Sequence, residues 1–336
     1  MNIDSELEAF SDVIERNGNA IMQRAMAQVL ESRYDAGDVS LAAKYHTRFL
    51  KKVLPVFPAI LSISCEAVCG NKEKTIGIGA ALTLFVEASN IHDDIIDQTF
   101  DKHKRKTTFA KFGSAIALLA GDLILVQAAL YLAKECETLP NDQRSEIIDL
   151  TYKALAEISK SAAMETKMQR KFNISPPDYL EVVRLRASVP QIHCMIGGIL
   201  GGGTKKMISY LGKYGKIYGV VGTVIDEFMD LHDYNKFSNR LKNECVPLPV
   251  LYSLKNAAIK EEIIPLLNKF AISKKEHDSL VVAVLGSEEV RNLQKETLQM
   301  LASQVHNIEK ELVKSSARGD LLTLNKVVER LLCNIG

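Results

Sequence analysis

The segment Ile76–Ile96 constrains the fold of this chain most strongly, because it is apolar on nearly every side of a helix. Its apolar residues recur at steps of three and four, which is the period of an α-helix rather than a strand. A helix that is hydrophobic all round is buried in the core of a large protein or in a membrane. No uninterrupted apolar run reaches about 18 residues, so we expect no membrane span. We therefore expect this helix at the centre of a bundle.

The same helical period covers most of the 336 residues, and strand-like alternation is rare. Further helices are expected, among others, over residues 177–199 and 206–231. Turn-forming residues break the pattern at 70–72, 139–142, 175–178, 201–203 and 235–249. The connections are short, and no Pro/Gly/Ser-rich linker divides the chain. We predict an all-α fold with a single large helical domain over residues 1–336.

The bulk composition excludes several classes of partner. Lys and Arg number 42 against 41 Asp and Glu, a net charge of +1, whereas nucleic acids and anionic membranes select basic surfaces. The six cysteines show no zinc-type pairing, and the sequence MNIDSELEAF lacks the basic-then-apolar layout of a signal peptide. We therefore expect reduced thiols in a cytoplasmic protein, with no nucleic acid as partner.

The apolar helix ends in a carboxylate cluster, Asp93, Asp94 and Asp97, within the sequence HDDIID. Residues four apart share a helix face, so Asp93 and Asp97 project side by side with Asp94 close by. Like charges at the negative end of a buried helix are destabilising unless a cation neutralises them. Mg²⁺ suits such a cluster, because it takes one or two carboxylates and leaves its other positions to water and substrate phosphates. The alternative is a solvated helix end with ordinary acidic residues.

A second carboxylate cluster, Asp226, Glu227 and Asp230, ends another long apolar helix. Asp226 and Asp230 again share a face. Two such clusters on facing helices could hold metal ions on both sides of one diphosphate.

A basic run, DKHKRK at residues 101–106, follows the first cluster directly. Charge runs are usually solvated faces. Because diphosphate oxygens beside a metal site need cations, Lys102 and Lys104 are candidate ligands for them.

Residues 85–128 resemble the trans-isoprenyl diphosphate synthase (polyprenyl synthetase) family. HDDIID matches its first aspartate-rich motif, DDxxD, and the segments 107–113 and 120–122 fall at the family's usual spacing. Weaker similarity covers most of the chain. The resemblance implies an isoprenoid synthase fold, a bundle of about a dozen helices around a central cavity. It also implies Mg²⁺-assisted departure of diphosphate from an allylic prenyl diphosphate, and a homodimer.

The chain departs from this family where isopentenyl diphosphate, the second substrate, binds. Elongating members carry a GKRxRP-like motif, but an ungapped count from HDDIID places VLPVFP, residues 53–58, at that position. Lys51 and Lys52 lie just upstream. The histidine expected seven positions before Asp93 is Val86, and the RRG after the first motif becomes KHK at residues 102–104.

The second motif, GxxFQxxDDxxD, is also altered. Its Phe-Gln pair is lost, and its second aspartate is lengthened to Glu227. The Gly-Lys before the TLP segment becomes Glu244-Cys245, and the middle-helix Lys-Thr becomes Arg186-Ala187, which keeps one cation.

These losses concentrate in the pocket for the second substrate, while the aspartates survive. Our leading hypothesis is therefore a class I terpene synthase-type enzyme that ionises an allylic diphosphate without isopentenyl diphosphate, followed by cyclisation or quenching. One alternative is chain elongation, with Arg48, Lys51 and Lys52 rebuilding the second diphosphate site. Another is a non-catalytic subunit of a heteromeric prenyl diphosphate synthase.

The candidate site residues fall into three sets. The small pair Ala88 and Ser89, one turn before Asp93, leaves room below the metals, and Phe85 is a candidate floor. The expected metal ligands are Asp93, Asp94, Asp97, Asp226, Glu227 and Asp230. The expected catalytic residues are Asp93, Asp94, Asp97, Lys102 and Arg186. The expected substrate-binding residues are Lys51, Lys52, Phe85, Ala88, Ser89, Lys102, Lys104, Arg186 and Thr223.

Overall fold

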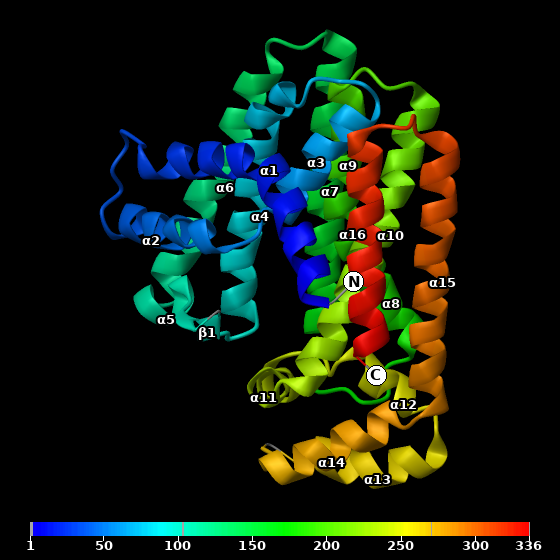
Figure 1. Cartoon of the computed structure of the whole chain (residues 1–336). Helices are drawn as coiled ribbons and strands as arrows, with labels where there is room; N and C mark the ends of the chain where they lie inside the picture. The colour runs from blue at the N-terminus through cyan, green and yellow to red at the C-terminus, as the bar shows by residue number, and fades with distance from the viewer. Residues whose placement is uncertain (1–2, 103, 270, 336) are drawn as a thin grey trace. The chain divides into compact units, whose positions relative to one another are not determined.

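The computed structural model describes residues 3–102, 104–269 and 271–335 and is all-α apart from one short hairpin (Figure 1), as predicted. Its elements are α1 (Ile3–Leu30), α2 (Asp38–Thr47), the 3₁₀ helix η1 (Arg48–Lys52), α3 (Val56–Ala67), η2 (Lys72–Thr75), α4 (Ile76–Ile96), β1 (Asp101–Lys102), β2 (Arg105–Lys106), α5 (Thr108–Phe112), α6 (Ser114–Cys136), α7 (Asn141–Thr166), α8 (Pro176–Arg186), α9 (Ser188–Leu200), α10 (Lys205–His232), α11 (Tyr234–Asn243), α12 (Leu248–Ser253), α13 (Ala257–Leu267), α14 (Lys274–Leu285), α15 (Glu288–Glu311) and α16 (Ser316–Asn334).

The chain divides into two compact units, which we describe separately. Unit 1 comprises Met1–Leu155, Val189–Gly215 and Ile308–Thr323, and unit 2 comprises Ala156–Ser188, Lys216–Asn307 and Leu324–Gly336. The chain passes from one unit to the other within α7, α10, α15 and α16, and after the first residue of α9, Ser188. The single domain over residues 1–336 stays a prediction.

Helix α4 forms the core of unit 1, and its bounds are those expected from the sequence. It packs against α1 and α6, and the side chains of Ala80, Leu84, Ala88 and Ile91 on α4 are fully buried. Small residues let α4 and α6 approach closely, since a Cβ atom on Gly121 of α6 would collide with the His92 ring of α4. The apolar surface removed from water here holds the carboxyl end of α4 in place.

Helix α6 has two apolar faces. It is the one described helix that length and composition alone would allow to cross a membrane. However, Ala117, Ala120, Ile124 and Ala128 are fully buried within unit 1, so α6 is a core helix of that unit. Its other face, which we call the α6 apolar face, exposes 49–69% of the side chains of Leu118, Leu119, Val126 and Leu130.

Two of the secondary-structure predictions were wrong, one at the border of unit 2 and one within it. The helix expected over residues 177–199 is broken at Ala187, which ends α8 before α9 begins at Ser188. The expected break at 235–249 contains α11, whose first turn is capped by Asp233: its carboxylate accepts hydrogen bonds from the N–H groups of Asn235 and Lys236. Phe237 and Leu241 bury the inner face of this short helix.

Candidate active site

The first carboxylate cluster lies where α4 ends, in unit 1. Asp93 and Asp94 occupy the last turn, and Asp97 is the C-cap, with its N–H donating to the Asp93 carbonyl at 2.8 Å. The chain then turns through Gln98, which has a positive φ of 51°, and the Thr99 N–H donates to the Asp94 carbonyl at 2.9 Å. This tight ending brings the three predicted carboxylates onto one turn of backbone.

Asp94 is the most deeply placed of the three carboxylates, with 5% exposure. Lys102 Nζ lies 3.5 Å from its Oδ1 atom. Burial raises the pKa of the Asp94 carboxyl, while the positive charges of Lys102 and His46 lower it. Asp93 and Asp97 are half-buried. The cluster is therefore partly desolvated, and Lys102 lies beside its most buried member.

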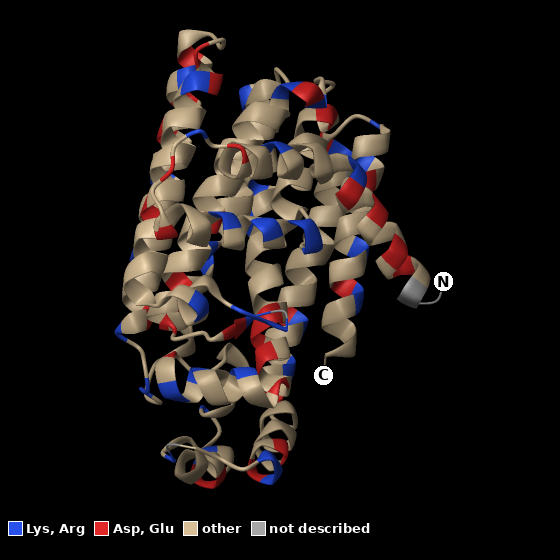
Figure 2. Cartoon of the chain, turned by 90° about the vertical axis from the view of Figure 1, so that its left-hand side faces the viewer, with Lys and Arg blue, Asp and Glu red and all other residues tan. Residues whose placement is uncertain are grey.

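The β1–β2 hairpin places that lysine. Its strands pair Asp101 with Lys106 and Lys102 with Arg105, and Figure 2 shows the basic residues along it in blue. The Arg105 guanidinium lies 4.3 Å from the ring centroids of both Tyr45 and Phe49, which anchors the hairpin to α2 and η1. Lys104 is exposed and has a positive φ of 61°, and residue 103 lies outside the described residues.

His46 on α2 is a residue that sequence reasoning missed. Its Nε2 atom lies 2.8 Å from Glu87 Oε2, and its Nδ1 atom lies 3.3 Å from Thr108 Oγ1. Glu87 is seven residues before Asp94 and therefore lies two turns along the same face of α4. A histidine thus reaches the α4 face from another helix, although position 86, where the family pattern expects one, is a valine. The signal was the helical stretch at Asp38–Thr47, which sequence analysis did not recognise.

The basic segment at Lys51 and Lys52 forms η1, and both side chains are exposed. Helix α3 begins at Val56 with Pro55 as its N-cap, whereas Pro58 lies inside the helix and is buried. If the proline of GKRxRP is matched to Pro55, Lys51 and Lys52 fall at the motif's lysine and first arginine. In that register two of the three basic positions are kept.

The residues one and two turns before Asp93 lie in the core of unit 1. Ala88 is fully buried, Phe85 is 7% exposed, and Ser89 Oγ donates to the Phe85 carbonyl at 3.1 Å. Both Phe85 and Ala88 belong to the main hydrophobic cluster of this unit.

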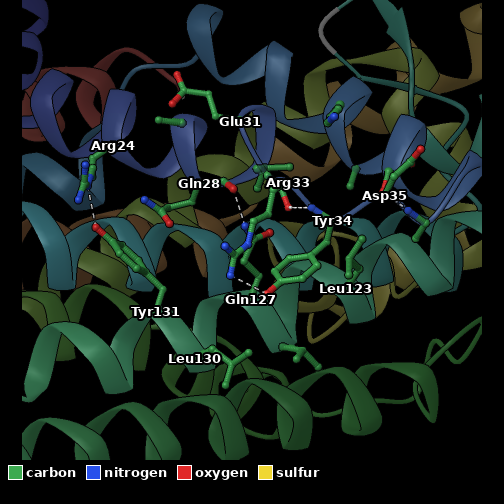
Figure 3. A pocket seen from close by; sticks show the side chains of 18 of the residues that line it. Arg24, Gln28, Glu31, Arg33, Tyr34, Asp35, Leu123, Gln127, Leu130 and Tyr131 are labelled. Carbon is green, nitrogen blue, oxygen red and sulfur yellow. Dashed lines mark hydrogen bonds between the residues drawn. The ribbon is translucent and has the colours of Figure 1, made fainter.

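A pocket of about 620 Å³ lies elsewhere in unit 1, between the end of α1, residues 31–36, the start of α2 and α6 (Figure 3). Arg24 Nε donates to the Tyr131 hydroxyl at 2.7 Å on one side, and Arg33 donates to the Tyr34 hydroxyl at 3.0 Å on another. None of the predicted site residues lines it. Two of its wall residues, Val126 and Leu130, belong to the α6 apolar face.

The second carboxylate cluster ends α10 in unit 2, and its three members differ. Glu227 is 2% exposed, and its carboxylate accepts from the Leu248 N–H at 2.8 Å and from the Tyr179 hydroxyl at 3.0 Å. Asp230 is half-buried, whereas Asp226 is exposed. Even so, the protein packed around the Asp226 carboxyl desolvates it, and with the nearby Asp230 charge this raises its pKa to about 6.

The remaining predicted residues of unit 2 lie near the same cluster or on the same helix. Arg186, the last residue of α8, donates to the buried Glu165 carboxylate. Thr223 on α10 donates to the Gly219 carbonyl at 2.9 Å, one turn earlier. Burial also raises the pKa of Glu244, which the sequence singled out only as a departure from the family's Gly-Lys, to about 7, although Arg240 opposes the shift.

Within the described residues, no group of three or more His, Cys, Asp or Glu side chains is arranged to hold a metal ion by itself. A magnesium ion completed by water and substrate phosphates needs only one or two carboxylates. The first cluster supplies hard oxygen donors in a partly desolvated position, so its residues fit such an ion.

The comparisons with known proteins agree with this fold and motif. A family model described as polyprenyl synthetase matches residues 56–285. The chain therefore belongs to the polyprenyl synthetase family, a class of isoprenoid diphosphate enzymes.

Individual relatives are distant. A geranylgeranyl diphosphate synthase of Sulfolobus acidocaldarius is 24% identical over 258 residues, which are 76% of this chain and 74% of that enzyme. One from Methanosarcina mazei is 28% identical over 175 residues, about half of each chain (52% and 53%). The crystal structure of a geranylgeranyl pyrophosphate synthetase from Pyrococcus horikoshii has a TM-score of 0.85 at 22% identity, covering 96% of this chain and 98% of that one. The chain thus has the all-α isoprenoid synthase fold.

Proposed function

We propose that this protein is a Mg²⁺-dependent prenyl diphosphate synthase that elongates an allylic prenyl diphosphate with isopentenyl diphosphate. One observation carries the proposal: a complete DDxxD cluster, the Lys102 hairpin and the Lys51-Lys52 segment belong to one unit. The Arg105 side chain of the hairpin stacks on Phe49, which belongs to η1 together with Lys51 and Lys52. The synthases among the relatives support the same reaction.

The roles follow from charge and position. Asp93, Asp94 and Asp97 hold the metal, and Lys102 and Lys104 bring positive charge to the allylic diphosphate. When bound by these carboxylates, Mg²⁺ would supply positive charge against the negative charge that develops on the leaving diphosphate. Lys51 and Lys52 hold the diphosphate of the second substrate, and Phe85, Ala88 and Ser89 limit the space for the growing chain.

The predicted residues of unit 2 have proposed roles of their own. Arg186 and Thr223 are assigned to substrate, and the second carboxylate cluster, Asp226, Glu227 and Asp230, is assigned to metal binding.

Elongation now has better support than the terpene synthase-type reaction that the sequence led us to favour. That hypothesis depended on the absence of basic residues before α3. With Pro55 as the N-cap of α3, Lys51 and Lys52 fill two of these positions, and His46 supplies an imidazole close to the face of α4 that carries Asp94.

We further propose a cytoplasmic homodimer in which a second copy covers the α6 apolar face. Four large apolar side chains on one exposed helix face are typical of an interaction surface. All six cysteines are free, as expected of a cytoplasmic protein. Leu130→Asp, at a side chain that is 69% exposed, should give a monomer in light scattering without loss of helix content.

The test is product analysis with purified protein and Mg²⁺. Ten-, fifteen- and twenty-carbon allylic diphosphates are each incubated with and without isopentenyl diphosphate. We expect longer prenyl diphosphates, formed only when the second substrate is present. Hydrocarbons or alcohols formed without it would establish the terpene synthase-type reaction instead. Activity that appears only after mixing with a partner subunit would identify a non-catalytic component.

A further inference from the structure

The end of α2 is joined by one buried imidazole to two other helices of unit 1. His46, the last but one residue of α2, lies 2.8 Å from Glu87 Oε2 on α4 through Nε2 and 3.3 Å from Thr108 Oγ1 on α5 through Nδ1. An ionised carboxylate only accepts hydrogen bonds, so Nε2 donates to Glu87 and Nδ1 is free to accept from the Thr108 hydroxyl. His46 therefore bridges α4 and α5.

Tyr45, the residue before His46, attaches the β1–β2 hairpin to the same end of α2. Its hydroxyl donates to the Lys106 carbonyl at 2.8 Å, and the Arg105 guanidinium lies 4.3 Å from its ring centroid. Lys111 Nζ of α5 lies 4.0 Å from the same centroid. Helix α2 also packs against α5 (Figure 1). The hairpin and α5 are thus held by two adjacent residues of α2.

The base of the hairpin is continuous with the segment that His46 binds. Thr107, the N-cap of α5, donates its N–H to the Phe100 carbonyl at 2.9 Å and so closes the hairpin. The next residue is Thr108, which is fully buried. Because His46 holds Thr108, the hairpin that carries Lys102 is fixed at its base as well as along its strand.

The other lysines of the proposed site follow directly from α2. The 3₁₀ helix η1 begins at Arg48, two residues after His46, and contains Lys51 and Lys52. No loop separates α2 from η1. The attachment of His46 to α4 therefore also fixes where this second pair of lysines lies.

We propose that His46 is a positioning residue that, through its bridge between α4 and α5, holds two lysine sets at a fixed separation: Lys102 of the hairpin, and Lys51 with Lys52 of η1. A site that is held in its binding geometry loses less free energy on ordering when substrate binds. His46 acts through these lysines. The inference rests on the proposed function, which assigns one diphosphate to each set.

The same unit contains a buried histidine without such a bridge. His193 on α9 is 1% exposed, and its Nδ1 atom lies 2.7 Å from the carbonyl of Val189 on its own helix. Its Nε2 atom has no hydrogen-bond partner among the residues that the structure describes. His193→Phe is therefore the matched control for a buried histidine that only stabilises the unit.

The test compares the kinetics of His46→Phe, which loses both hydrogen bonds but keeps an aromatic ring, with those of His193→Phe. In His46→Phe, the KM values for the allylic diphosphate and for isopentenyl diphosphate should each rise about tenfold. Its kcat should stay within about threefold, because a loss of binding shared by ground state and transition state raises KM alone. His193→Phe should leave both KM values within about twofold.

Three outcomes would count against these assignments. KM values of His46→Phe within about twofold of the unmutated protein would overturn this inference alone. Equal rises in His46→Phe and His193→Phe would do the same, because they would show only a loss of stability. No chain elongation by the unmutated protein would overturn the proposed function and this inference together.

A milder variant covers the case in which His46→Phe does not fold. Thr108→Val is isosteric and removes one of the two hydrogen bonds, so both KM values should rise about threefold. Where His46→Phe folds, adding Thr108→Val should change neither KM further, since that bond is already lost. KM values unchanged by Thr108→Val alone would contradict the bridge.

Amide hydrogen exchange tests the bridge without turnover. The amides of Arg105 and Lys106 in β2 should exchange about tenfold faster in Thr108→Val and His46→Phe, because the base of the hairpin is released. They should exchange at the original rate in His193→Phe. Unchanged exchange in both bridge variants would overturn the inference and leave the proposed function standing.

Discussion

The two carboxylate clusters have nearly the same sequence pattern but different surroundings. Each ends a long apolar helix and places acidic residues four apart on one face. At the first cluster, buried Asp94 faces Lys102, whose side chain is 49% exposed and 3.5 Å away. At the second, buried Glu227 faces Arg240, whose side chain is 5% exposed and 3.0 Å away. The two clusters therefore differ in how deeply the cation beside them is buried, which spacing along the sequence does not encode.

The largest expected effect on stability is at the second cluster. Arg240→Met would leave several buried carboxylates without their cation, and breaking a buried pair costs about 3–5 kcal/mol. Chemical denaturation measures this loss. Arg291→Met, at an exposed arginine of α15, is the control and should stay within about 0.5 kcal/mol of the unmutated protein. A loss below about 1 kcal/mol for Arg240→Met would contradict the buried network.

The pH dependence of stability tests the same network. Burial raises the pKa of Glu244 from 4.5 to about 7, so between these pH values the folded chain keeps a proton that the unfolded chain releases. The free energy of unfolding therefore falls as pH rises from 4.5 to 7, by up to about 3 kcal/mol at about 1.4 kcal/mol per pKa unit. Glu244→Gln should remove the part of this pH-dependent fall in the free energy of unfolding that Glu244 causes. The variant keeps an acceptor for the Asn239 side chain. An identical pH profile in the variant would refute the assignment.

Close packing behind the first cluster gives an intermediate effect. A Cβ atom at position 121 collides with the His92 ring next to Asp93, so Gly121→Ala should lower the free energy of unfolding by about 1–3 kcal/mol. Adding His92→Ala should recover part of the loss, because it removes the ring. Additive losses in the double variant would show that the two residues are not in contact.

The smallest effect is expected at the lysine of the first cluster. Lys102→Met should change the free energy of unfolding by less than about 1 kcal/mol, because the Lys102 side chain is 49% exposed and its ion pair is screened by water. The kcat of Lys102→Met should fall clearly, although its free energy of unfolding changes little. A stability loss as large as that of Arg240→Met would abolish the distinction between the two clusters.

Helices with strong apolar periodicity could be predicted from the sequence. Ile76–Ile96 is found with its expected bounds, and the helix expected over 206–231 is Lys205–His232. Helix α11 was missed because its Asn- and Lys-rich sequence reads as a loop. Asp233 as a cap before Phe237 and Leu241 was the available signal.

Only those features of the candidate site that depend on residue spacing along the sequence could be predicted. The aspartates at the end of α4 follow from HDDIID, but the partners of Glu227 come from α8, α11 and the start of α12. His46 likewise meets Glu87 across 41 residues. Such contacts depend on tertiary packing, and spacing alone leaves the register of Lys51 and Lys52 open.

Turnover of Asp94→Asn with Mg²⁺, an allylic diphosphate and isopentenyl diphosphate tests the central claim most directly. If the first cluster holds the metal, kcat should fall about 100- to 1000-fold. Stability should not fall, because burial already raises the Asp94 pKa and so disfavours its charged form. Asp149→Asn, an exposed carboxylate of α7, should keep full activity. Turnover of Asp94→Asn within about twofold of the unmutated protein would contradict the account.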